Sequence, residues 1–582
     1  MATLTEYYKY VVDKWYSGSS RKFIEYAIST IEREMSRKNI FVIEAPTGYG
    51  KSAISATLSL YSVYEEFKSI IAFPLRTLLE DQYSGFLKLV PRELIGKRYM
   101  HTAESPYLIH PITLTTIDTL SLTVFGIAPE DLNKVMKKYF KLGTSTGSMG
   151  HYWYSWGSVG LSNIVLDEVH LVADSTKSIN FLATLMDFVI RHDGKLVLMS
   201  ATLPKALKET LLNIAKFPEK MEIIEFSSRE GYDEEFVSER RKKKYNVQLA
   251  PLSSEEKFEA IESWILSNKG KYDKVIVIFN TVNDAIEFYS RIVNNKDFAE
   301  YLKVLLHSRF TEEDRKYRFN RLKEASKKEK YIVVTTQTIE AGVNVSSTLM
   351  ISEIAPANSL IQRFGRFLRY NEIKGRAYIW FEVDEKGNVK CDEKGRHYKV
   401  YDCSLVRKTL QYLKKHGNLN FHVPQEYSSF LNEVYCREDF NVDFKTVTRM
   451  INIFLSYDYA PKKAVDEFLR LEGSFVREGL ILPTIPNSYL EGKCIEDIVA
   501  VRRSDLEKNI VPLQYSVLKK YFDNKIITLE NGVFKIENVN DKWDVIDNPK
   551  KLLMFFYRRG NVLAFVVKGN YNSLLGLRLK EE

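Results

Sequence analysis

The chain has 582 residues, of which 45% are hydrophobic and 27% charged, a composition that excludes disordered, collagen-like and coiled-coil classes. Its 84 basic and 75 acidic residues leave a net charge of +9, which permits an anionic partner without requiring one. The four cysteines have neither C-x-x-C spacing nor histidines at zinc spacing, so we expect neither structural zinc nor a disulfide framework.

Short apolar runs alternate with helical patterns from about residue 22 to residue 385, which is typical of parallel sheets covered by helices. Ten runs are predicted as buried strands: 40–44, 69–73, 163–167, 195–199, 222–226, 274–279, 302–306, 331–335, 349–352 and 377–381. Because so many strands exceed one ordinary sheet, we expect two α/β domains. The charged stretch 226–250 is interpreted as a linker, and its basic run, residues 240–244, as solvated surface.

The pattern changes after residue 385. Residues 403–416 have helical spacing, and Asn531-Gly532 lies between two apolar runs, which is a strong hairpin signal. The apolar runs 552–557 and 562–567 suggest a second hairpin. We therefore predict a mixed α+β accessory region over 386–582, with no chemistry that the sequence identifies.

The segment Ala45-Pro-Thr-Gly-Tyr-Gly-Lys-Ser52 follows a predicted strand and begins a helical stretch. It fits the phosphate-loop pattern, with Ala45 in place of the first glycine. Glycines in this loop let backbone N–H groups face a phosphate. Lys51 is expected to neutralise the β- and γ-phosphates of ATP, and the Ser52 hydroxyl to ligate Mg²⁺. The nucleotide-binding candidates here are Ala45, Pro46, Thr47, Gly48, Tyr49, Gly50, Lys51 and Ser52.

Two carboxylates, Asp167 and Glu168, come at the end of the predicted strand 163–167, and ligand sites of α/β proteins form at such strand ends. Asp167 is expected to hold Mg²⁺ and Glu168 to act as general base on the attacking water, a pairing that suits phosphoryl transfer. An isolated Asp-Glu pair is usually a solvated loop, but a phosphate loop upstream and an apolar strand before the pair favour the catalytic interpretation.

Together with Asp167-Glu-Val-His170 and Ser200-Ala-Thr202, the phosphate loop resembles the motor of superfamily 2 DExH helicases. Residues 335–344 resemble its motif V, and Gln362-Arg-Phe-Gly-Arg-Phe-Leu-Arg369 resembles its motif VI, which supplies arginine fingers. The resemblance implies catalytic roles for Arg366 and Arg363, with Arg369 less favoured. It also implies nucleotide contacts by Gly342, Asn344 and Arg369, and coupling roles for His170, Ser200, Thr202 and Gln362.

A narrower resemblance is carried by His307-Ser-Arg-Phe310, by Gln337-Thr-Ile-Glu-Ala-Gly-Val-Asn-Val345 and by the run from Ala355 to Arg366. This succession resembles the CRISPR-associated helicase of type I interference systems. The resemblance implies ATP-driven, 3′ to 5′ movement on single-stranded DNA after recruitment by an RNA-guided surveillance complex. Many members carry a fused metal-dependent HD nuclease, but the nine histidines here form no such pattern. We therefore expect the helicase half alone, with a separate HD nuclease subunit as partner.

The predicted fold class is α/β, with two tandem RecA-like domains of parallel sheets and a C-terminal α+β accessory domain. The predicted boundaries are an N-terminal segment 1–20, a nucleotide-binding RecA-like domain 21–228, a second RecA-like domain 229–385 and the accessory domain 386–582. Family-like nucleic-acid contact segments lie at 74–77, 115–118 and 335–336, where hydroxyls and an arginine suit phosphates. The candidates are Arg76, Thr116, Thr335 and Thr336.

An aromatic segment, Tyr152-Trp-Tyr-Ser-Trp156, follows the small, polar residues 143–150. Its rings are interpreted as core packing, with base stacking or a docking patch as alternatives. Other functions also stay open: a DNA-repair or RNA-remodelling helicase, or a clamp that does not hydrolyse ATP. No signal peptide or membrane span is predicted, so we expect a cytoplasmic protein. Only seven glutamines beside many charges suggest an archaeal thermophile.

Overall fold

A computed structural model describes residues 2–99, 102–141, 152–171, 175–340, 342–417, 419–455, 460–490, 506, 508–530, 533–539 and 545–580. The chain divides into two compact units. Unit 1 contains residues 1–238 and 431–478, and unit 2 contains residues 239–430 and 479–582. None of the helices in the described part is both long and apolar enough to cross a membrane.

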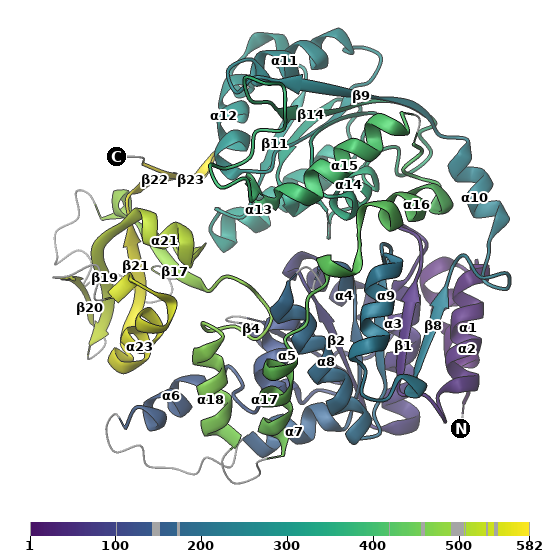
Figure 1. Cartoon of the computed structure of the whole chain (residues 1–582), viewed down its shortest axis with the longest axis vertical. Coiled ribbons are helices and arrows are strands. Elements are labelled where there is room, and N and C mark those ends of the chain that lie inside the picture. Colours follow the sequence, from purple (N-terminus) through teal and green to yellow (C-terminus); the bar gives the residue numbers. More distant parts are fainter. Residues whose placement is uncertain are drawn as a thin grey trace. The chain divides into compact units, whose positions relative to one another are not determined.

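Unit 1 is built on an eight-stranded sheet in the order β4-β3-β5-β2-β6-β7-β1-β8. Figure 1 labels β4, β2, β1 and β8 of this sheet. All neighbouring strands are parallel except β3 and β4. The central strands are buried along their whole length because both faces of a parallel sheet are covered by helices. The strands are β1 Ile40–Glu44, β2 Lys68–Phe73, β3 Ile95–Tyr99, β4 Thr102–Ala103, β5 Ile112–Thr116, β6 Ser162–Leu166, β7 Leu196–Ser200 and β8 Met221–Glu225.

The α-helices of unit 1 include two from the accessory region of the sequence, α17 and α18, of which α17 packs on α8. Ser175 caps α8 by accepting a hydrogen bond from the backbone N–H of Ser178, a capping arrangement that serine favours. The helices are α1 Leu4–Tyr16, α2 Lys22–Glu34, α3 Ser52–Tyr61, α4 Arg76–Phe86, α5 Ile117–Val124, α6 Leu132–Tyr139, α7 Tyr152–Gly160, α8 Thr176–Arg191, α9 Lys205–Ile214, α17 Phe444–Phe454 and α18 Ala460–Arg470. The helix α10 Glu234–Arg241 crosses from unit 1 into unit 2.

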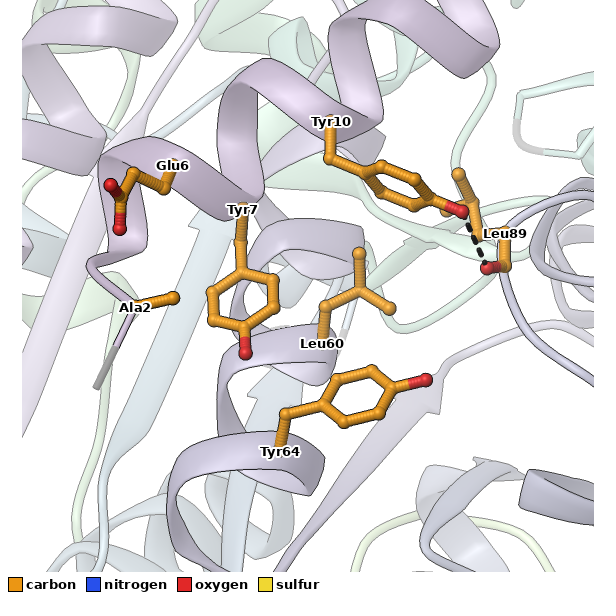
Figure 2. A pocket seen from close by; sticks show the side chains of 7 residues that line it. All are labelled: Ala2, Glu6, Tyr7, Tyr10, Leu60, Tyr64 and Leu89. Carbon is orange, nitrogen blue, oxygen red and sulfur yellow. Dashed lines mark hydrogen bonds between the residues drawn. The ribbon is translucent and has the colours of Figure 1, made fainter.

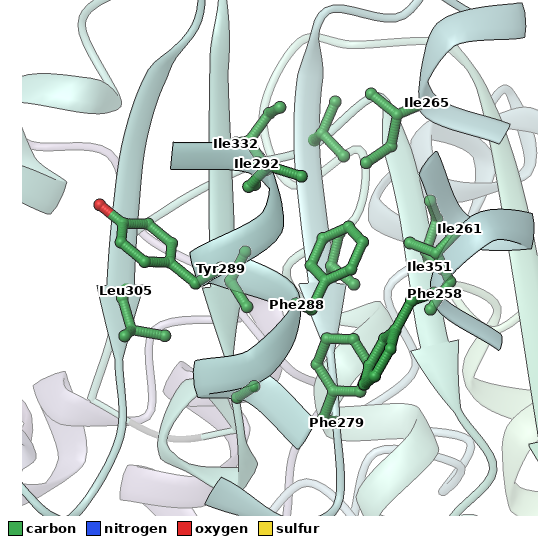
Figure 3. Packing of buried hydrophobic residues seen from close by; sticks show 14 of the residues in the cluster. Phe258, Ile261, Ile265, Phe279, Phe288, Tyr289, Ile292, Leu305, Ile332 and Ile351 are labelled. Carbon is green, nitrogen blue, oxygen red and sulfur yellow. The ribbon is translucent and has the colours of Figure 1, made fainter. Parts of the chain in front are cut away.

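Unit 2 contains a six-stranded parallel sheet in the order β11-β12-β10-β13-β14-β9. Figure 3 shows its core, in which Phe258 and Ile261 of α11 and Phe288 of α12 pack on the strands. The strands are β9 Lys244–Leu252, β10 Lys274–Ile278, β11 Leu302–Leu306, β12 Tyr331–Thr335, β13 Leu349–Glu353 and β14 Lys374–Glu382. The helices are α11 Lys257–Ser267, α12 Val282–Val293, α13 Glu312–Ala325, α14 Ala357–Phe364 and α15 Cys403–Lys415, and α16 Pro424–Val434 crosses into unit 1.

The rest of unit 2 is a mixed five-stranded sheet in the order β18-β17-β21-β19-β20, followed by the hairpin β22–β23. The strands are β17 Ile481–Pro486, β18 Val511–Gln514, β19 Phe522–Glu530, β20 Val533–Asn538, β21 Val562–Val567, β22 Gly569–Asn572 and β23 Gly576–Leu579. The helices are α21 Tyr515–Tyr521 and α23 Pro549–Arg559, and a small pair, β15 His397–Tyr398 and β16 Tyr401–Asp402, precedes α15.

The ten strands predicted from apolar runs all occur, and the helix predicted over 403–416 is α15. Four strands of the two large sheets were missed, namely β3, β4, β5 and β9, because they contain threonine or charged residues in place of a continuous apolar run. The interpretation of 226–250 as a linker was wrong, since most of this stretch forms α10 and the edge strand β9.

The expectation that the basic run 240–244 is solvated was wrong for Lys243. Its side chain is buried, and Nζ donates to the carbonyl oxygens of Tyr370 and Glu372 at 2.8 and 3.2 Å. Burial lowers the pKa of Lys243 to about 8. The carbonyl groups explain why a cation is tolerated here without a carboxylate at hydrogen-bond distance.

The first predicted hairpin is confirmed, because β19 and β20 pair antiparallel with Glu530 opposite Val533. Its turn, Asn531-Gly532, lies outside the described residues. The second predicted hairpin was wrong, since residues 549–559 form α23. Asn548 caps this helix and Gly560, at φ +65°, ends it, which are ordinary helix start and stop signals.

The cysteines also differ from the expectation of no disulfide framework. Cys391 and Cys403 form one disulfide, with their Cα atoms 6.1 Å apart. A separation of twelve residues is not a recognisable spacing, so the pairing depends on the way the chain folds back before α15.

Candidate functional site

The phosphate-loop residues connect β1 to α3, as the sequence predicts. Gly48 and Gly50 have φ values of +74° and +98°, a conformation that side chains other than glycine disfavour. Tyr49 is buried within the loop, and its hydroxyl donates to Asp233 Oδ2 at 2.5 Å while accepting from the backbone N–H of Phe23 at 3.1 Å. The loop is thus held from both α2 and the segment before α10.

The acidic pair lies at the carboxyl end of β6, close to the phosphate-loop lysine. Lys51 Nζ is 3.6 Å from Glu168 Oε1 and 3.4 Å from the carbonyl oxygen of Ala45. Asp167 is buried, and its Oδ1 accepts the backbone N–H of Glu168 at 3.0 Å. Burial, and then the negative charge of Glu168, raises the pKa of Asp167. Glu168 itself has φ +52°, an uncommon conformation that occurs at functional sites.

Three of the predicted coupling residues, His170, Ser200 and Thr202, are connected to this pair by hydrogen bonds and close contacts. His170 Nδ1 lies 2.7 Å from Ser200 Oγ and 3.4 Å from Glu168 Oε2. Ser200 Oγ also accepts the backbone N–H of Thr202 at 3.1 Å. Burial lowers the pKa of His170 to about 4, so its imidazole is neutral at physiological pH. Because β7 lies between β6 and β1, Ser200 is at the strand end between the acidic pair and the phosphate loop.

The residues expected to hold a nucleotide and Mg²⁺ fit that role by geometry. Thr47 Oγ1 is buried without a hydrogen-bond partner in the structure, which fits a hydroxyl prepared for a bound polar group. Ser52 Oγ accepts from Gln82 Nε2 at 2.8 Å. No cluster of three or more His, Cys, Asp or Glu residues suited to a protein-caged metal occurs among the described residues. Gln82 and Asp233 were not predicted from the sequence, because no motif gives a signal for them.

The three motif VI arginines of unit 2 all contact residues 336–344, here called the motif V loop. Arg363 is fully buried, and its Nε donates to Glu340 Oε1 at 2.9 Å. Arg366 donates to the carbonyl oxygens of Ile339 and Glu340 at 3.1 and 2.9 Å. Arg369, which is partly exposed, donates to Asn344 Oδ1 at 3.0 Å. Gly342 lies in the same loop at φ +74°, and Gln362 is buried on α14.

Arg363 uses its whole guanidinium group inside unit 2. Besides Glu340, it donates to Ser352 Oγ, to the carbonyl oxygen of Glu353, to Asn280 Oδ1 and to the hydroxyl of Tyr401, at 2.8 to 3.1 Å. The resemblance to motif VI favoured Arg363 over Arg369 as an arginine finger. The geometry favours the reverse order, because an enclosed guanidinium with all its donors used is not available to a phosphate.

The predicted nucleic-acid contacts lie at the carboxyl ends of strands in both sheets. Arg76 begins α4 after β2 and is partly exposed, whereas Thr116 is buried and caps α5 after β5. Thr335 and Thr336, at the end of β12, are also buried. The three threonine side chains are therefore enclosed within their own units, and Arg76 is the predicted contact whose side chain is partly exposed.

The aromatic segment 152–156 lies in α7 and divides between two environments. Trp156 is buried, as core packing requires, whereas Trp153 and Tyr154 are 49% and 67% exposed. The small residues 143–150 before it lie outside the described residues. Elsewhere in unit 1, Figure 2 shows a hollow lined by Ala2, Glu6, Tyr7, Tyr10, Leu60, Tyr64 and Leu89. It contains none of the residues predicted to bind the nucleotide.

Comparison with known proteins adds an independent finding. The family model described as DEAD/DEAH box helicase matches residues 25–210, and the model described as CRISPR-associated nuclease/helicase Cas3, C-terminal, matches residues 271–372. A protein of Methanocaldococcus jannaschii named as a Cas3 nuclease/helicase is 27% identical over 441 residues, which cover 70% of this chain and 53% of that protein. The chain spans about half the length of the curated relatives it matches.

Solved structures share the fold of the chain. The crystal structure of T. fusca Cas3 with ATP matches with a TM-score of 0.65 and 14% identity, covering 100% of this chain and 72% of that one. A chain of a CRISPR RNA-guided surveillance complex in a pre-nicking state matches with a TM-score of 0.59 and 14% identity, covering 96% and 70%. These matches confirm the predicted fold class, with two RecA-like sheets and a C-terminal accessory part. In sequence and in fold, the chain resembles the superfamily 2 helicases and, among them, the CRISPR-associated helicase Cas3.

Proposed function

We propose that the chain is an ATP-dependent DNA helicase or translocase, a nucleic-acid-stimulated ATPase that moves on single-stranded DNA in type I CRISPR interference. The observation that carries this proposal is the arrangement at three neighbouring strand ends of unit 1. There Lys51, Asp167 and Glu168 lie together, and Ser200 lies between them on β7. The resemblance to Cas3 supports the choice of substrate and pathway.

ATP and Mg²⁺ are proposed to occupy the phosphate loop, held by Lys51, the Ser52 hydroxyl and the Asp167 carboxylate. When bound, Mg²⁺ neutralises charge that develops on the phosphates. Glu168 is proposed to accept the proton of the attacking water. The Glu168 carboxylate lies between Lys51 and His170, at 3.6 and 3.4 Å, and these contacts orient it. Because His170 is neutral, Lys51 is the one charged partner of the two.

The arginines of unit 2 are proposed to divide their roles. Arg366 and Arg369 serve as the fingers that contact the nucleotide, with Asn344 and Gly342 shaping the loop beside them. Arg363 holds the motif V loop through Glu340 instead of touching the nucleotide, since it is fully buried. His170, Ser200, Thr202 and Gln362 are proposed to transmit nucleotide state to the DNA-contacting loops.

The partners proposed are single-stranded DNA, contacted by Arg76, Thr116, Thr335 and Thr336, an RNA-guided surveillance complex and a separate HD nuclease subunit, all in the cytoplasm. The relatives are named for both nuclease and helicase, and the aligned region is about half their length. The assignment of the nuclease to another polypeptide is part of this proposal. A pull-down of the purified chain with a candidate HD protein tests it, and failure to co-purify at micromolar concentration contradicts it.

The function is tested by the ATPase rate with single-stranded DNA, double-stranded DNA or RNA. We expect stimulation by single-stranded DNA above the other two. We expect Lys51→Ala and Glu168→Gln each to abolish turnover, because the first removes phosphate neutralisation and the second the base. Lys216→Ala, an exposed lysine outside the site, is the matched control and should keep wild-type rates. Turnover that persists in both site variants contradicts the motor assignment, and stimulation by RNA alone indicates RNA remodelling instead.

A further inference from the structure

A segment of the accessory region, residues 471–478, contacts α8 and two strand-end loops of unit 1. It follows α18, and the N-terminal end of α8 holds it in place. Lys177 Nζ donates to the carbonyl oxygen of Leu471 at 2.7 Å, and Ser178 Oγ donates to that of Val476 at 2.7 Å. The helix α8 follows the acidic loop in the chain, so the segment is anchored on the element that comes after Asp167 and Glu168.

Arg477 extends from this segment to two other loops at the same edge of the sheet. Its Nε donates to Asp118 Oδ1 at 2.6 Å and its Nη2 to Asp118 Oδ2 at 2.8 Å. The same Nη2 donates to the carbonyl oxygen of Pro74 at 2.9 Å. Asp118 lies in the first turn of α5, two residues after Thr116, and Pro74 lies two residues before Arg76.

The contacts of Arg477 join two adjacent strand ends, and the rest of the segment contacts α8. In the sheet, β5, β2 and β6 are neighbours, and Asp118, Pro74 and the acidic loop follow their carboxyl ends. The planar guanidinium binds the carboxylate in a bidentate manner, which fixes direction as well as distance. Arg477 and Asp118 are each 38% exposed, and a half-exposed pair adds little to folding stability. The contact is therefore suited to setting loop geometry.

We propose that Arg477 is a positioning residue that holds loops 74–77 and 115–118 in the arrangement that receives the DNA backbone, and that segment 471–478 links these loops to α8. The accessory region thereby supplies part of the DNA-contacting edge of unit 1. This inference rests on the proposed function, because it concerns how the motor engages its nucleic acid.

The test compares Arg477→Ala, Arg477→Lys and Asp118→Asn in the full chain. Arg470→Ala is the control, since Arg470 lies at the end of α18 and contacts Glu467 instead of the loops. The readouts are the oligonucleotide concentration that half-maximally stimulates the ATPase, the maximal rate and the melting temperature. We expect Arg477→Ala and Asp118→Asn to raise the half-stimulating concentration by about tenfold, with melting temperature and the Arg470→Ala control unchanged. Arg477→Lys should be intermediate, because an ammonium keeps the charge and loses the fork.

Asp118→Asn separates positioning from direct phosphate binding by Arg477. Positioning requires both partners, so both variants should weaken DNA stimulation alike. If Arg477 instead bound a DNA phosphate directly, Asp118→Asn would free its guanidinium and strengthen that contact. A lower half-stimulating oligonucleotide concentration in Asp118→Asn therefore overturns the proposal. So does an unchanged DNA dependence in Arg477→Ala. If the wild-type chain itself shows no stimulation by any nucleic acid, the proposed function fails first, and the two failures are thereby distinguished.

Discussion

Arg363, Arg366 and Arg369 come from one motif but occupy three different environments. Arg363 is enclosed at 0% exposure and ion-paired with Glu340, whereas Arg369 is partly exposed on Asn344. The motif predicts that arginines are present, but it does not predict which of their guanidinium groups are buried and hydrogen-bonded within the protein. That depends on Asn280, Ser352 and Tyr401, which are distant in the chain.

Replacement of Arg363 should therefore lower mainly the stability of the protein, and replacement of Arg369 mainly its ATPase rate. Arg363→Ala leaves the buried carboxylate of Glu340 without its partner, so we expect the free energy of unfolding to fall by about 3–5 kcal/mol. Arg369→Ala should keep the stability and lower the ATPase kcat by about a thousandfold, the usual worth of an arginine finger. Urea unfolding and steady-state ATPase assays measure the two quantities. An Arg363→Ala protein as stable as the wild type contradicts the positioning role.

At the scale of elements, continuous apolar runs were sufficient to predict ten of the parallel strands. Such runs are buried on both faces, so burial and sequence pattern agree. The edge strand β9 alternates in burial and was read as part of a linker. Helix α23 was read as a strand because its apolar residues are adjacent, although Asn548 and Gly560 mark its ends. The phosphate loop and acidic pair were predictable because they follow such runs. Contacts such as Arg477 with Asp118 were not, because they join distant segments.

The C-terminal hairpin β22–β23 shows how such distant contacts stabilise an element. Leu577 N donates to the carbonyl oxygen of Arg309 at 2.9 Å, and His307 Nε2 lies 3.0 Å from that of Leu575. Gly576 sits at φ +74°, and a Cβ there would lie 2.7 Å from His307 Cε1 and 2.8 Å from the carbonyl oxygen of Arg309. The hairpin thus packs closely on the loop that follows β11.

Gly576→Ala should destabilise unit 2 through both strain and this close approach. Gly387→Ala is a matched control, since Gly387 has φ +77° and nothing within 4 Å of its Cβ position. Gly387→Ala should lower the free energy of unfolding by about 1 kcal/mol, because alanine disfavours the left-handed backbone conformation. Gly576→Ala should lower the free energy of unfolding by about 1–3 kcal/mol more than Gly387→Ala, because the added Cβ forces the neighbouring atoms apart. Denaturant titration gives both values, and equal losses in the two variants would show that the contact with His307 is unimportant.

At the scale of the whole molecule, the accessory region does not form a single added body. Residues 431–478 lie in unit 1 and residues 479–582 in unit 2, so each motor sheet has its own part of the region. The sequence pattern did not predict this division, because both crossings, within α16 and after Glu478, lie inside the stretch that was predicted as one accessory region. The domain boundaries predicted at residues 228 and 385 stay predictions.

The net charge of the chain bears on which groups attract DNA. A net charge of +9 over 582 residues is too dilute to dominate association, so affinity should come from local groups at the strand ends. Arg76 is such a group, after β2. Lys216 is an exposed lysine in the connection that leads to the amino end of β8, at the opposite edge of the same sheet.

Arg76→Ala and Lys216→Ala remove the same single charge from these opposite edges. Each phosphate neutralised on single-stranded DNA contributes about 0.7 to the slope of log K against log salt concentration. Arg76→Ala should therefore make that slope shallower by about 0.7, whereas Lys216→Ala should leave it unchanged. Fluorescence anisotropy of a labelled oligonucleotide at several salt concentrations measures the slope. Equal changes in the two variants would mean that the overall charge, and not the strand-end loops, attracts the DNA.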